Sequence, residues 1–266
     1  QMCIRDSYDG GAVGLGLGAI ASGIGAMNLG TTAMIRLVAD RPIMDRFPQM
    51  RLQTYYLAGG RWFPGGAINN AGSVLQWLQE AVLGLAYAEQ EALAEAVGGP
   101  TGLLFLPFLT GERYPGISHL ASGVIFGLRA HHHRGHLTRA AMEGVAFALR
   151  LILEALRAND LSPLRLRAGG GGTRSALWMR ILASVFQTPV EVPEIAEPAL
   201  TGSAALARVA IGAAPDLWSA VREVPVRIYE PVPDWVPIYE RQFERFQALM
   251  GNLEEAFRRH QEIFGG

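Results

Sequence analysis

Two glycine-rich turns that carry hydroxyl side chains constrain this chain more than any other feature of its sequence. The first is Asn28-Leu29-Gly30-Thr31-Thr32, the second runs from Gly169 to Ser175, and each follows a short apolar segment. Such turns expose several backbone N–H groups together, and Thr and Ser hydroxyls add donors that reach phosphate oxygens. Two turns of this kind in one chain predict a nucleotide that lies between them.

The absence of lysine narrows the chemistry of such a nucleotide site. All 23 residues counted as Lys or Arg are arginine. A P-loop needs a lysine to reach the outer phosphates, and a Schiff-base enzyme needs an amine. Both classes of protein are therefore excluded.

The composition predicts a globular protein that acts on small molecules. Half of the 266 residues are hydrophobic and 18% are charged, so the chain can bury a sizeable core. The net charge is −1 and the arginines are spread along the sequence, which argues against nucleic acid or an anionic membrane as partner. The single Cys3 cannot form an internal disulfide. This fits a reducing compartment, and we expect a cytoplasmic protein.

Residues 10–35 contain no charged side chain and are numerous enough to cross a bilayer. Eight glycines in this segment would make a poor lipid-facing helix, so we expect no membrane span. Residues 1–7 match neither helix nor strand and are interpreted as an irregular leader of foreign or truncated origin. Residues 8–266 are expected to form one domain.

Hydrophobic periodicity predicts that strands and helices alternate along the chain. The expected strands are 25–29, 33–39, 52–57, 61–63, 103–106, 123–128, 164–168 and 189–192. The expected helices are 69–83, 137–158, 175–187, 200–211 and an amphipathic helix that ends near 264. Because the glycine-rich turns follow strands, this order predicts an α/β fold with ligands at one edge of a mostly parallel or mixed sheet.

Several segments have both a structural and a functional interpretation. Asp9 precedes a glycine pair, where it is either a helix-capping carboxylate or a general base aimed at a substrate hydroxyl. The turn at Gly30 is either a tight hairpin or a phosphate site. Gly72 and Gln76, one helical turn apart, either complete the cleft or cap a helix. Four consecutive glycines from Gly169 carry a large conformational entropy cost, which favours close approach to a ligand.

Two further motifs are interpreted as structural. The histidines at 131, 132, 133 and 136 have no carboxylate or cysteine at ligand spacing, so they are read as an exposed polar loop. Residues 14–18, Gly-Leu-Gly-Leu-Gly, are similar to a dinucleotide fingerprint. Their spacing is wrong and the expected acidic residue is not evident.

Together these residues resemble the C-terminal domain of the FGGY carbohydrate kinases, most closely the gluconate kinase and xylulose kinase branch. The resemblance runs from Tyr8 to about Ala214. Its most specific part comprises residues 123–128, a seven-residue gap and residues 136–143, which fit the family's C-terminal signature. The other matching segments are Asp9-Gly10, residues 28–32, 65–72, 76–78, 106–113, 169–175 and 197–205.

The resemblance implies a ribonuclease-H-like, actin-like ATPase domain with a mixed sheet and helices on both faces. It implies that ATP, with Mg²⁺ bridging its phosphates, lies between this domain and an N-terminal sugar-binding domain. Asp9 would be the catalytic base, and the loop from Gly111 to Arg113 would face the cleft. The residues implied to bind the cofactor are Gly30, Thr31 and Thr32 at the outer phosphates, Gly72 and Gln76 beside the nucleotide, and Gly169, Gly170, Gly171 and Thr173 along the adenosine and inner phosphate.

The chain departs from the family pattern because the N-terminal half has no counterpart in it. We therefore interpret it as a fragment that is not expected to phosphorylate a substrate alone. The expected function of the intact protein is ATP-dependent phosphorylation of a sugar or sugar acid, with a gluconate-like substrate favoured by residues 66–70. The alternatives are a non-catalytic nucleotide-binding module of the same fold and a dinucleotide-dependent oxidoreductase. A homodimer stays open.

Overall fold

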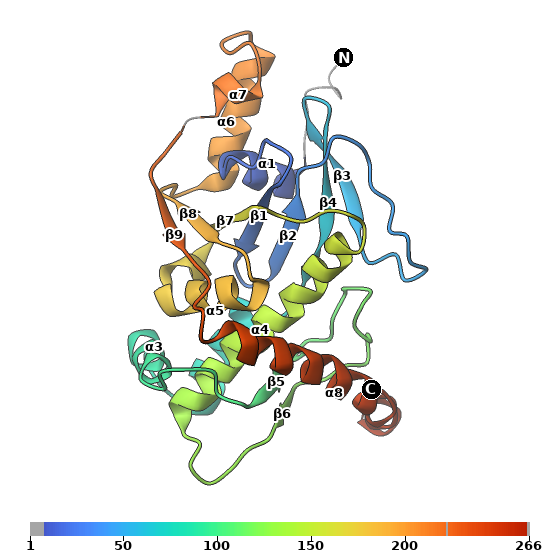
Figure 1. The fold of residues 1–266 in the computed structure, drawn as a ribbon, viewed down its shortest axis with the longest axis vertical. Coiled ribbons are helices and arrows are strands. Elements are labelled where there is room, and N and C mark those ends of the chain that lie inside the picture. Colours follow the sequence, from blue (N-terminus) through green and yellow to red (C-terminus); the bar gives the residue numbers. More distant parts are fainter. Residues whose placement is uncertain (1–7, 222, 265–266) are drawn as a thin grey trace.

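The centre of the computed structural model is a seven-stranded mixed sheet (Figure 1). The structure describes residues 8–221 and 223–264, so the leader interpreted at residues 1–7 lies outside the described residues. The strands lie in the order β3-β4-β2-β1-β7-β8-β9. Their bounds are β1 Ile24–Leu29, β2 Ala33–Leu37, β3 Gln53–Ala58, β4 Arg61–Ile68, β7 Arg165–Gly169, β8 Val190–Pro193 and β9 Val226–Tyr229.

Four strands of this sheet run in the same direction. β1 pairs with β7 and β7 with β8 in parallel, while β2 is antiparallel to both β1 and β4. Asn28 on β1 stands opposite Gly169 on β7, and Ala33 on β2 stands opposite Ile68 on β4. The carboxyl ends of β1, β4, β7 and β8 therefore meet at one edge of the sheet, where ligands of open α/β sheets bind.

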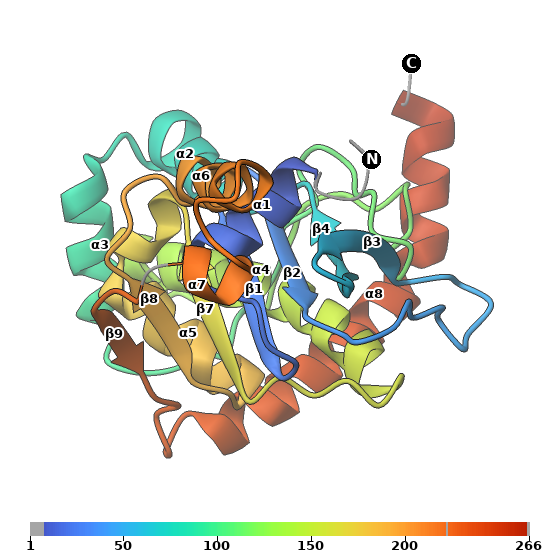
Figure 2. The same cartoon turned by 90° about the horizontal axis from the view of Figure 1, so that it is seen from above.

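Helices cover both faces of the sheet (Figure 2). α1 (Asp9–Gly16) and α6 (Pro198–Ala210) pack together on one face, and the short α7 (Leu217–Ala220) contacts α6. On the other face lie α4 (Arg134–Arg157) and α5 (Ala176–Phe186), and α8 (Val236–Phe264) packs against α5. This arrangement agrees with the mixed sheet and two helical layers expected from the sequence.

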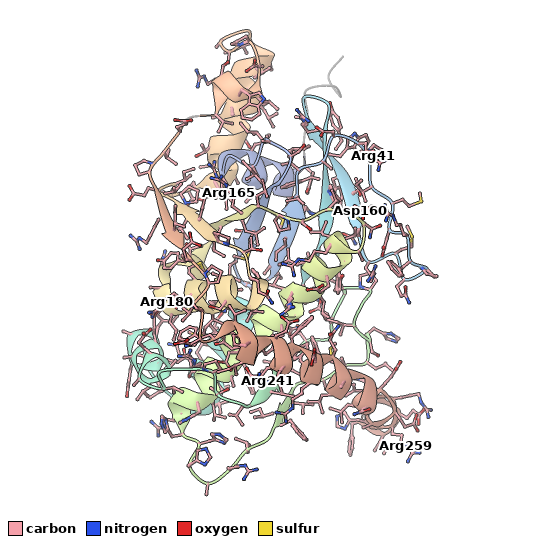
Figure 3. All side chains as sticks on the ribbon, viewed as in Figure 1. Arg41, Asp160, Arg165, Arg180, Arg241 and Arg259 are labelled. Atoms are coloured by element: carbon pink, nitrogen blue, oxygen red, sulfur yellow. The ribbon has the colours of Figure 1, made fainter. Side chains whose placement is uncertain are left out.

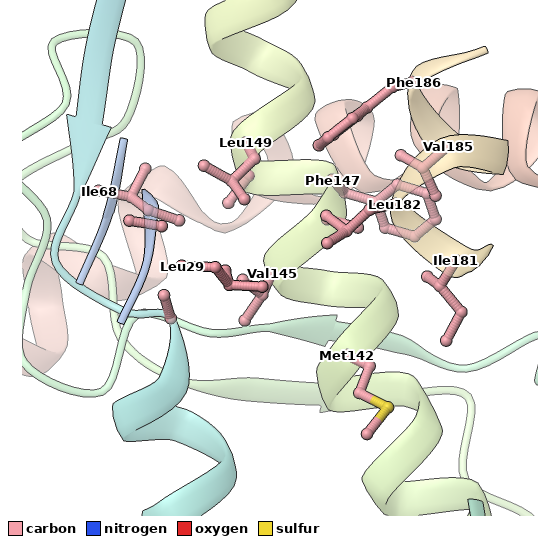
Figure 4. Packing of buried hydrophobic residues seen from close by; sticks show 14 of the residues in the cluster. Leu29, Ile68, Met142, Val145, Phe147, Leu149, Ile181, Leu182, Val185 and Phe186 are labelled. Atoms are coloured by element: carbon pink, nitrogen blue, oxygen red, sulfur yellow. The ribbon is translucent and has the colours of Figure 1, made fainter. Parts of the chain in front are cut away.

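The alternation of strand side chains divides the core in two. On β1, Met27 and Leu29 point into the large cluster on the α4 and α5 face, whereas Ala26 joins the smaller cluster beneath α1. Figure 4 shows Val145, Leu149 and Leu182 of the large cluster together with Leu29. Each face of the sheet is thus covered, which explains why β1 at its centre is apolar except for Asn28.

The predicted strands are present with end shifts of a few residues, and β4 is longer than expected because it continues to Ile68. The helix expected over 69–83 consists of α2 (Gly72–Trp77) followed by a π-helical turn, η2 (Leu78–Leu83). β5 (Leu104–Leu106) and β6 (Val124–Phe126) form a separate two-stranded sheet. α3 (Tyr87–Glu95), a 3₁₀ turn, η3 (Gly171–Arg174), and the edge strand β9 were not predicted.

α1 was also not predicted, because its sequence, DGGAVGLG, has poor intrinsic helix propensity. The glycines allow close packing. A Cβ atom on Gly14 would lie 2.6 Å from the Phe63 ring, and one on Gly16 would lie 1.8 Å from the Pro198 carbonyl oxygen. Tertiary contacts that only glycine permits therefore hold this helix in place.

The arginines are distributed around the molecule, as Figure 3 shows for Arg41, Arg165, Arg180, Arg241 and Arg259. Many take part in ion pairs, such as the one between Arg180 and Glu95 at 2.6 Å. This distribution agrees with the absence of a basic block in the sequence. Within the described residues, no helix combines the length and the apolar character needed to span a bilayer.

Candidate functional site

The first glycine-rich turn is bonded to the start of α2 at the shared edge of the sheet. The Gly72 N–H donates to the Gly30 carbonyl at 2.9 Å, and the Ser73 N–H donates to the Thr31 carbonyl at 3.2 Å. A Cβ atom on Gly72 would lie 2.6 Å from the Gly30 oxygen, so only glycine allows this approach. Thr31 and Thr32 are exposed, which leaves their hydroxyls free to face a ligand.

The second glycine-rich turn follows β7 and lies directly beside the first. Gly170 has a φ of +92°, and a Cβ atom there would lie 2.6 Å from the Leu29 oxygen. No heavy atom lies within 4 Å of the Cβ position of Gly171, so this glycine faces open space. The Thr173 hydroxyl donates to the Gly170 carbonyl at 2.8 Å. The fold therefore brings the two predicted turns together.

A cleft of about 570 Å³ extends from this edge across the ends of β2, β3 and β4. Asp9, Asn28 and Thr32 line it, with Ala199 from the first turn of α6. The remaining lining residues are Tyr8, Gly10, Val13, Ala33, Met34, Arg36, Arg51, Gln53, Tyr55, Gly66, Ala67, Arg113, Tyr114 and Pro115. The candidate base and the first phosphate turn thus share one cavity.

Asp9 is the first residue of α1 and is exposed to this cleft. Its Oδ1 accepts a hydrogen bond from the Gly10 N–H at 2.7 Å, and the positive end of the helix dipole favours a carboxylate at this position. Tyr8 before it has extended backbone geometry, so the helix begins at the carboxylate itself. Since Tyr8 is the N-cap and no side chain of the described residues caps α1, the helix-capping interpretation of Asp9 is wrong. Its exposed position in the cleft is compatible with the interpretation as a reactive base.

Three arginines line the cleft. The sequence analysis placed Arg113 there as part of the loop from Gly111, but it missed Arg36 and Arg51. Arg36 comes from β2, Arg51 precedes β3, and Arg113 follows the buried Glu112. A charged residue in an otherwise apolar strand is the signal that could have identified Arg36. Tyr8 and Tyr55 stack at 4.3 Å beside it, and burial raises the pKa of Tyr8.

The loop that carries Arg113 is fixed by Glu112, which is 6% exposed. Its carboxylate accepts backbone N–H groups of Asn69 at 2.9 Å and Arg113 at 2.8 Å. The Asn70 amide also donates to the Gly111 carbonyl at 2.7 Å. Of the loop from Gly111 to Arg113 that was expected to face the cleft, Arg113 lines it, whereas Glu112 binds the end of β4.

The other predicted positions differ in how close they come to the cleft. Gly30, Thr31, Gly72 and the glycines from 169 to 171 lie at the same edge but outside the cleft lining. Gln76 is exposed on α2, and its amide donates to Glu80 at 3.0 Å. Neither Gln76 nor Thr173 lines the cleft.

The histidine-rich segment leads into α4, which begins at Arg134, so that His131, His132 and His133 lie in the preceding loop. His133 is the N-cap of this helix, accepting from the Gly135 N–H, and His136 completes a reciprocal capping arrangement. Among the described residues, no group of three or more His, Cys, Asp or Glu could hold a metal ion. The residues 14–18 lie in α1 and the turn after it, before β1 instead of after a strand, unlike a dinucleotide fingerprint.

Comparison with known proteins agrees with the fold and with the order of the motifs. Residues 25–211 match the family described as "FGGY family of carbohydrate kinases, C-terminal domain". The chain is 34% identical over 264 residues to a gluconokinase of Bacillus subtilis, covering 94% of this chain and 51% of that protein. It is 33% identical to a glycerol kinase of Ectopseudomonas mendocina, covering 69% of this chain and 38% of the relative.

Solved structures show the same architecture. A xylulose kinase from Lactobacillus acidophilus superposes with a TM-score of 0.85 at 27% identity, over 93% of this chain and 51% of that one. A gluconate kinase from the same organism gives a TM-score of 0.85, also at 27% identity and with the same coverage of both chains. The chain spans about half the length of the curated relatives it matches.

Proposed function

Because the chain belongs to the FGGY family of carbohydrate kinases, we propose that it is the nucleotide-binding half of an ATP-dependent kinase. The proposed substrate is a sugar or a sugar acid, with a gluconate-like compound favoured. The observation that carries this proposal is the single cleft shared by Asp9 and the turn at Thr32. It would bring an acceptor hydroxyl and the outer end of a triphosphate together, which is the main requirement of phosphoryl transfer.

In this proposal Asp9 acts as the general base. Its exposed carboxylate would accept the proton from the attacking hydroxyl, and the Gly10 N–H holds Oδ1 through a hydrogen bond of 2.7 Å. No other carboxylate lines the cleft among the described residues. Asp9 is therefore the residue we assign to proton transfer.

The edge of the sheet offers hydrogen-bond donors and open space that suit a nucleotide. The exposed Thr31 and Thr32 suit phosphate oxygens, and the empty volume at Gly171 allows a ligand to approach the backbone closely. Gly30 and Gly72 would support the outer phosphates, and Gly169 and Gly170 the inner part. We propose Gln76 and Thr173 as peripheral contacts. Mg²⁺ bound with ATP would neutralise phosphate charge.

The proposed function also implies partners for this chain. The intact protein would contain an N-terminal sugar-binding domain that completes the cleft, and it would work in the cytoplasm. A homodimer is an open possibility of the family resemblance. That domain would supply the sugar contacts that this chain does not make.

Replacement of Asp9 tests the proposal. In the full-length kinase, Asp9→Asn should lower kcat by at least about 10³-fold, because the substitution removes a general base but keeps the size of the side chain. ATP affinity, measured by titration calorimetry, should change less than about threefold. Near-normal turnover would refute the role of Asp9. ATP binding without any sugar-dependent ADP release in the unmodified kinase would instead favour a non-catalytic module.

A further inference from the structure

The cleft contains an excess of positive charge that the proposed reaction with a neutral sugar would not need. Arg36, Arg51 and Arg113 line it, and Asp9 is the one acidic side chain among the described lining residues. Arg51 is already neutralised, since it donates to both oxygens of Asp45 at 2.9 and 3.0 Å. Neither Arg36 nor Arg113 forms an ion pair with a carboxylate of the described residues. Two guanidinium groups therefore line the cleft without an ion-pair partner among the described residues.

Arg36 is held in a fixed orientation and lacks an acceptor. Arg36 is only 4% exposed. Its Nη1 donates to the carbonyls of Gln53 at 2.6 Å and Phe63 at 3.2 Å. The guanidinium carbon lies 4.4 Å from the centre of the Tyr55 ring. The buried Nε has no hydrogen-bond partner. A buried donor without a partner is costly, so an acceptor supplied by a ligand would stabilise this site.

Arg113 adds a second charge close to the first. Burial lowers the pKa of Arg36, and the positive charge of Arg113 lowers it as well, while Tyr8, Tyr55 and Asp9 act in the opposite direction. The backbone of Arg113 is fixed through Glu112, but its side chain is exposed and free to reorient. The pair thus combines one rigid and one adaptable guanidinium, which suits a planar anion.

We propose that Arg36 and Arg113 form a carboxylate subsite that selects a sugar acid over the corresponding neutral sugar. This inference rests on the proposed kinase function and adds the residues that decide its substrate. The carboxylate would lie against the two guanidinium groups, and the hydroxyl to be phosphorylated would lie at the other end of the substrate, beside Asp9. Both positions belong to the same cleft of about 570 Å³, a volume typical of small-molecule sites.

The test compares matched acids and alcohols in the full-length kinase. The acceptors are D-gluconate with D-glucitol, and D-xylonate with D-xylitol, so that each pair differs at the carboxylate end. The unmodified kinase should show a kcat/KM at least about 100-fold higher for each acid than for its partner. Arg113→Gln should lower kcat/KM for the acids by about 10–100-fold, mainly through KM, and leave the alcohols unchanged. Arg113→Lys should restore part of the loss.

A matched control and the opposing outcomes complete the test. Arg241→Gln removes an exposed arginine of α8 that does not line the cleft, and it should change neither substrate class. If Arg113→Gln raises the KM for ATP instead, the arginine serves a phosphate of the nucleotide and the carboxylate subsite is wrong. Equal turnover of acids and alcohols would overturn the inference but leave the kinase function intact. If no acceptor is phosphorylated, both are rejected.

Discussion

At the scale of single residues, the glycines of the nucleotide edge do two different things. Gly72 and Gly170 are required by packing, because a Cβ atom at either position would lie 2.6 Å from a backbone carbonyl oxygen. Gly171 has no such neighbour within 4 Å, so the folded chain alone does not require glycine there. Because Gly171 lies beside the turn at Gly30, we propose that close approach of a ligand requires glycine at this position.

Gly171→Ala separates these two explanations. The substitution should leave the melting temperature within about 2 °C of the unmodified chain, because the added methyl group meets no protein atom. It should weaken ATP binding by about tenfold, since the methyl group would occupy the volume that we assign to the nucleotide. Thermal unfolding and calorimetric titration with ATP measure the two effects.

Gly72→Ala is the matched comparison. Its methyl group would collide with the Gly30 carbonyl, so this variant should lose about 1–3 kcal/mol of unfolding free energy as well as ATP affinity. If Gly171→Ala binds ATP normally, the nucleotide does not approach this turn.

A buried acid on α4 gives the chain a specific dependence of stability on pH. Burial raises the pKa of Glu143 to about 7, against opposing hydrogen bonds from Thr101 and Tyr239 and the charge of Arg139. The Thr101 hydroxyl donates to its carboxylate at 2.7 Å and the Tyr239 hydroxyl at 2.9 Å. Because the folded state raises this pKa from 4.5, it favours the protonated form. The stabilisation is complete below about pH 4.5 and is lost as pH rises towards 7.

Glu143→Gln should remove this dependence. Between pH 5 and pH 8 the unfolding free energy of the unmodified chain should fall relative to that of the variant, by an amount on the order of 3 kcal/mol, since one pKa unit corresponds to about 1.4 kcal/mol. Urea unfolding at several pH values in that range measures the difference. Parallel curves for the two proteins would show that Glu143 stays ionised beside Arg139.

At the scale of secondary-structure elements, the contact between α1 and α6 decides where Asp9 lies. A Cβ atom on Gly202 would lie 1.8 Å from the Ala12 carbonyl oxygen and 2.8 Å from the Gly16 nitrogen. The two helices therefore touch through their backbones, and α1 has little helix propensity of its own to hold it in place. The position of Asp9, the carboxylate that we propose as base, therefore depends on α6.

Gly202→Ala should push the two helices apart. We expect a loss of at least about 1–3 kcal/mol in unfolding free energy and a lower kcat in the full-length kinase, because Asp9 moves with α1. Gly251→Ala on α8 is the control, since no atom lies within 4 Å of its Cβ position. That substitution should stabilise the chain by about 0.5–1 kcal/mol. An unchanged kcat in Gly202→Ala would show that the carboxylate is positioned independently of α6.

The sequence predicted those elements whose local pattern agrees with their final structure. Apolar strands ending in glycine turns at Gly30 and Gly169 were recognisable, and so was the long amphipathic α4. α1 was not predicted because its stability comes from tertiary contacts of glycine. The edge strand β9 was not predicted because prolines flank its exposed residues. Arg36 was missed because only the fold brings it into one cleft with residues distant in sequence, whereas Arg113 was expected there only through the loop that the family resemblance implies.

At the scale of the whole molecule, the chain presents the edge that we propose binds the nucleotide and one side of a cleft. Its curated relatives are about twice as long, and we propose that the other side comes from a second domain. The chain alone should bind ATP, because both glycine-rich turns belong to it. At a concentration ten times Kd, ATP should stabilise the chain by about 1.4 kcal/mol and raise its melting temperature by about 3–5 °C.

The same preparation should release no ADP on addition of gluconate. A coupled ADP assay on the isolated chain and on the full-length kinase measures this difference. Sugar-dependent ADP release by the chain alone would mean that it holds a complete acceptor site. The absence of any thermal shift with ATP would mean that the turns need the second domain to become binding-competent.

The backbone contact between α1 and α6 also has a mechanical consequence. Ala199, in the first turn of α6, and Asp9, at the start of α1, both line the cleft, and their two helices touch through their backbones. Because backbone atoms of the two helices are in contact, we expect a displacement of α6 to shift Asp9 as well, so the acid would follow any movement of the helix beside it.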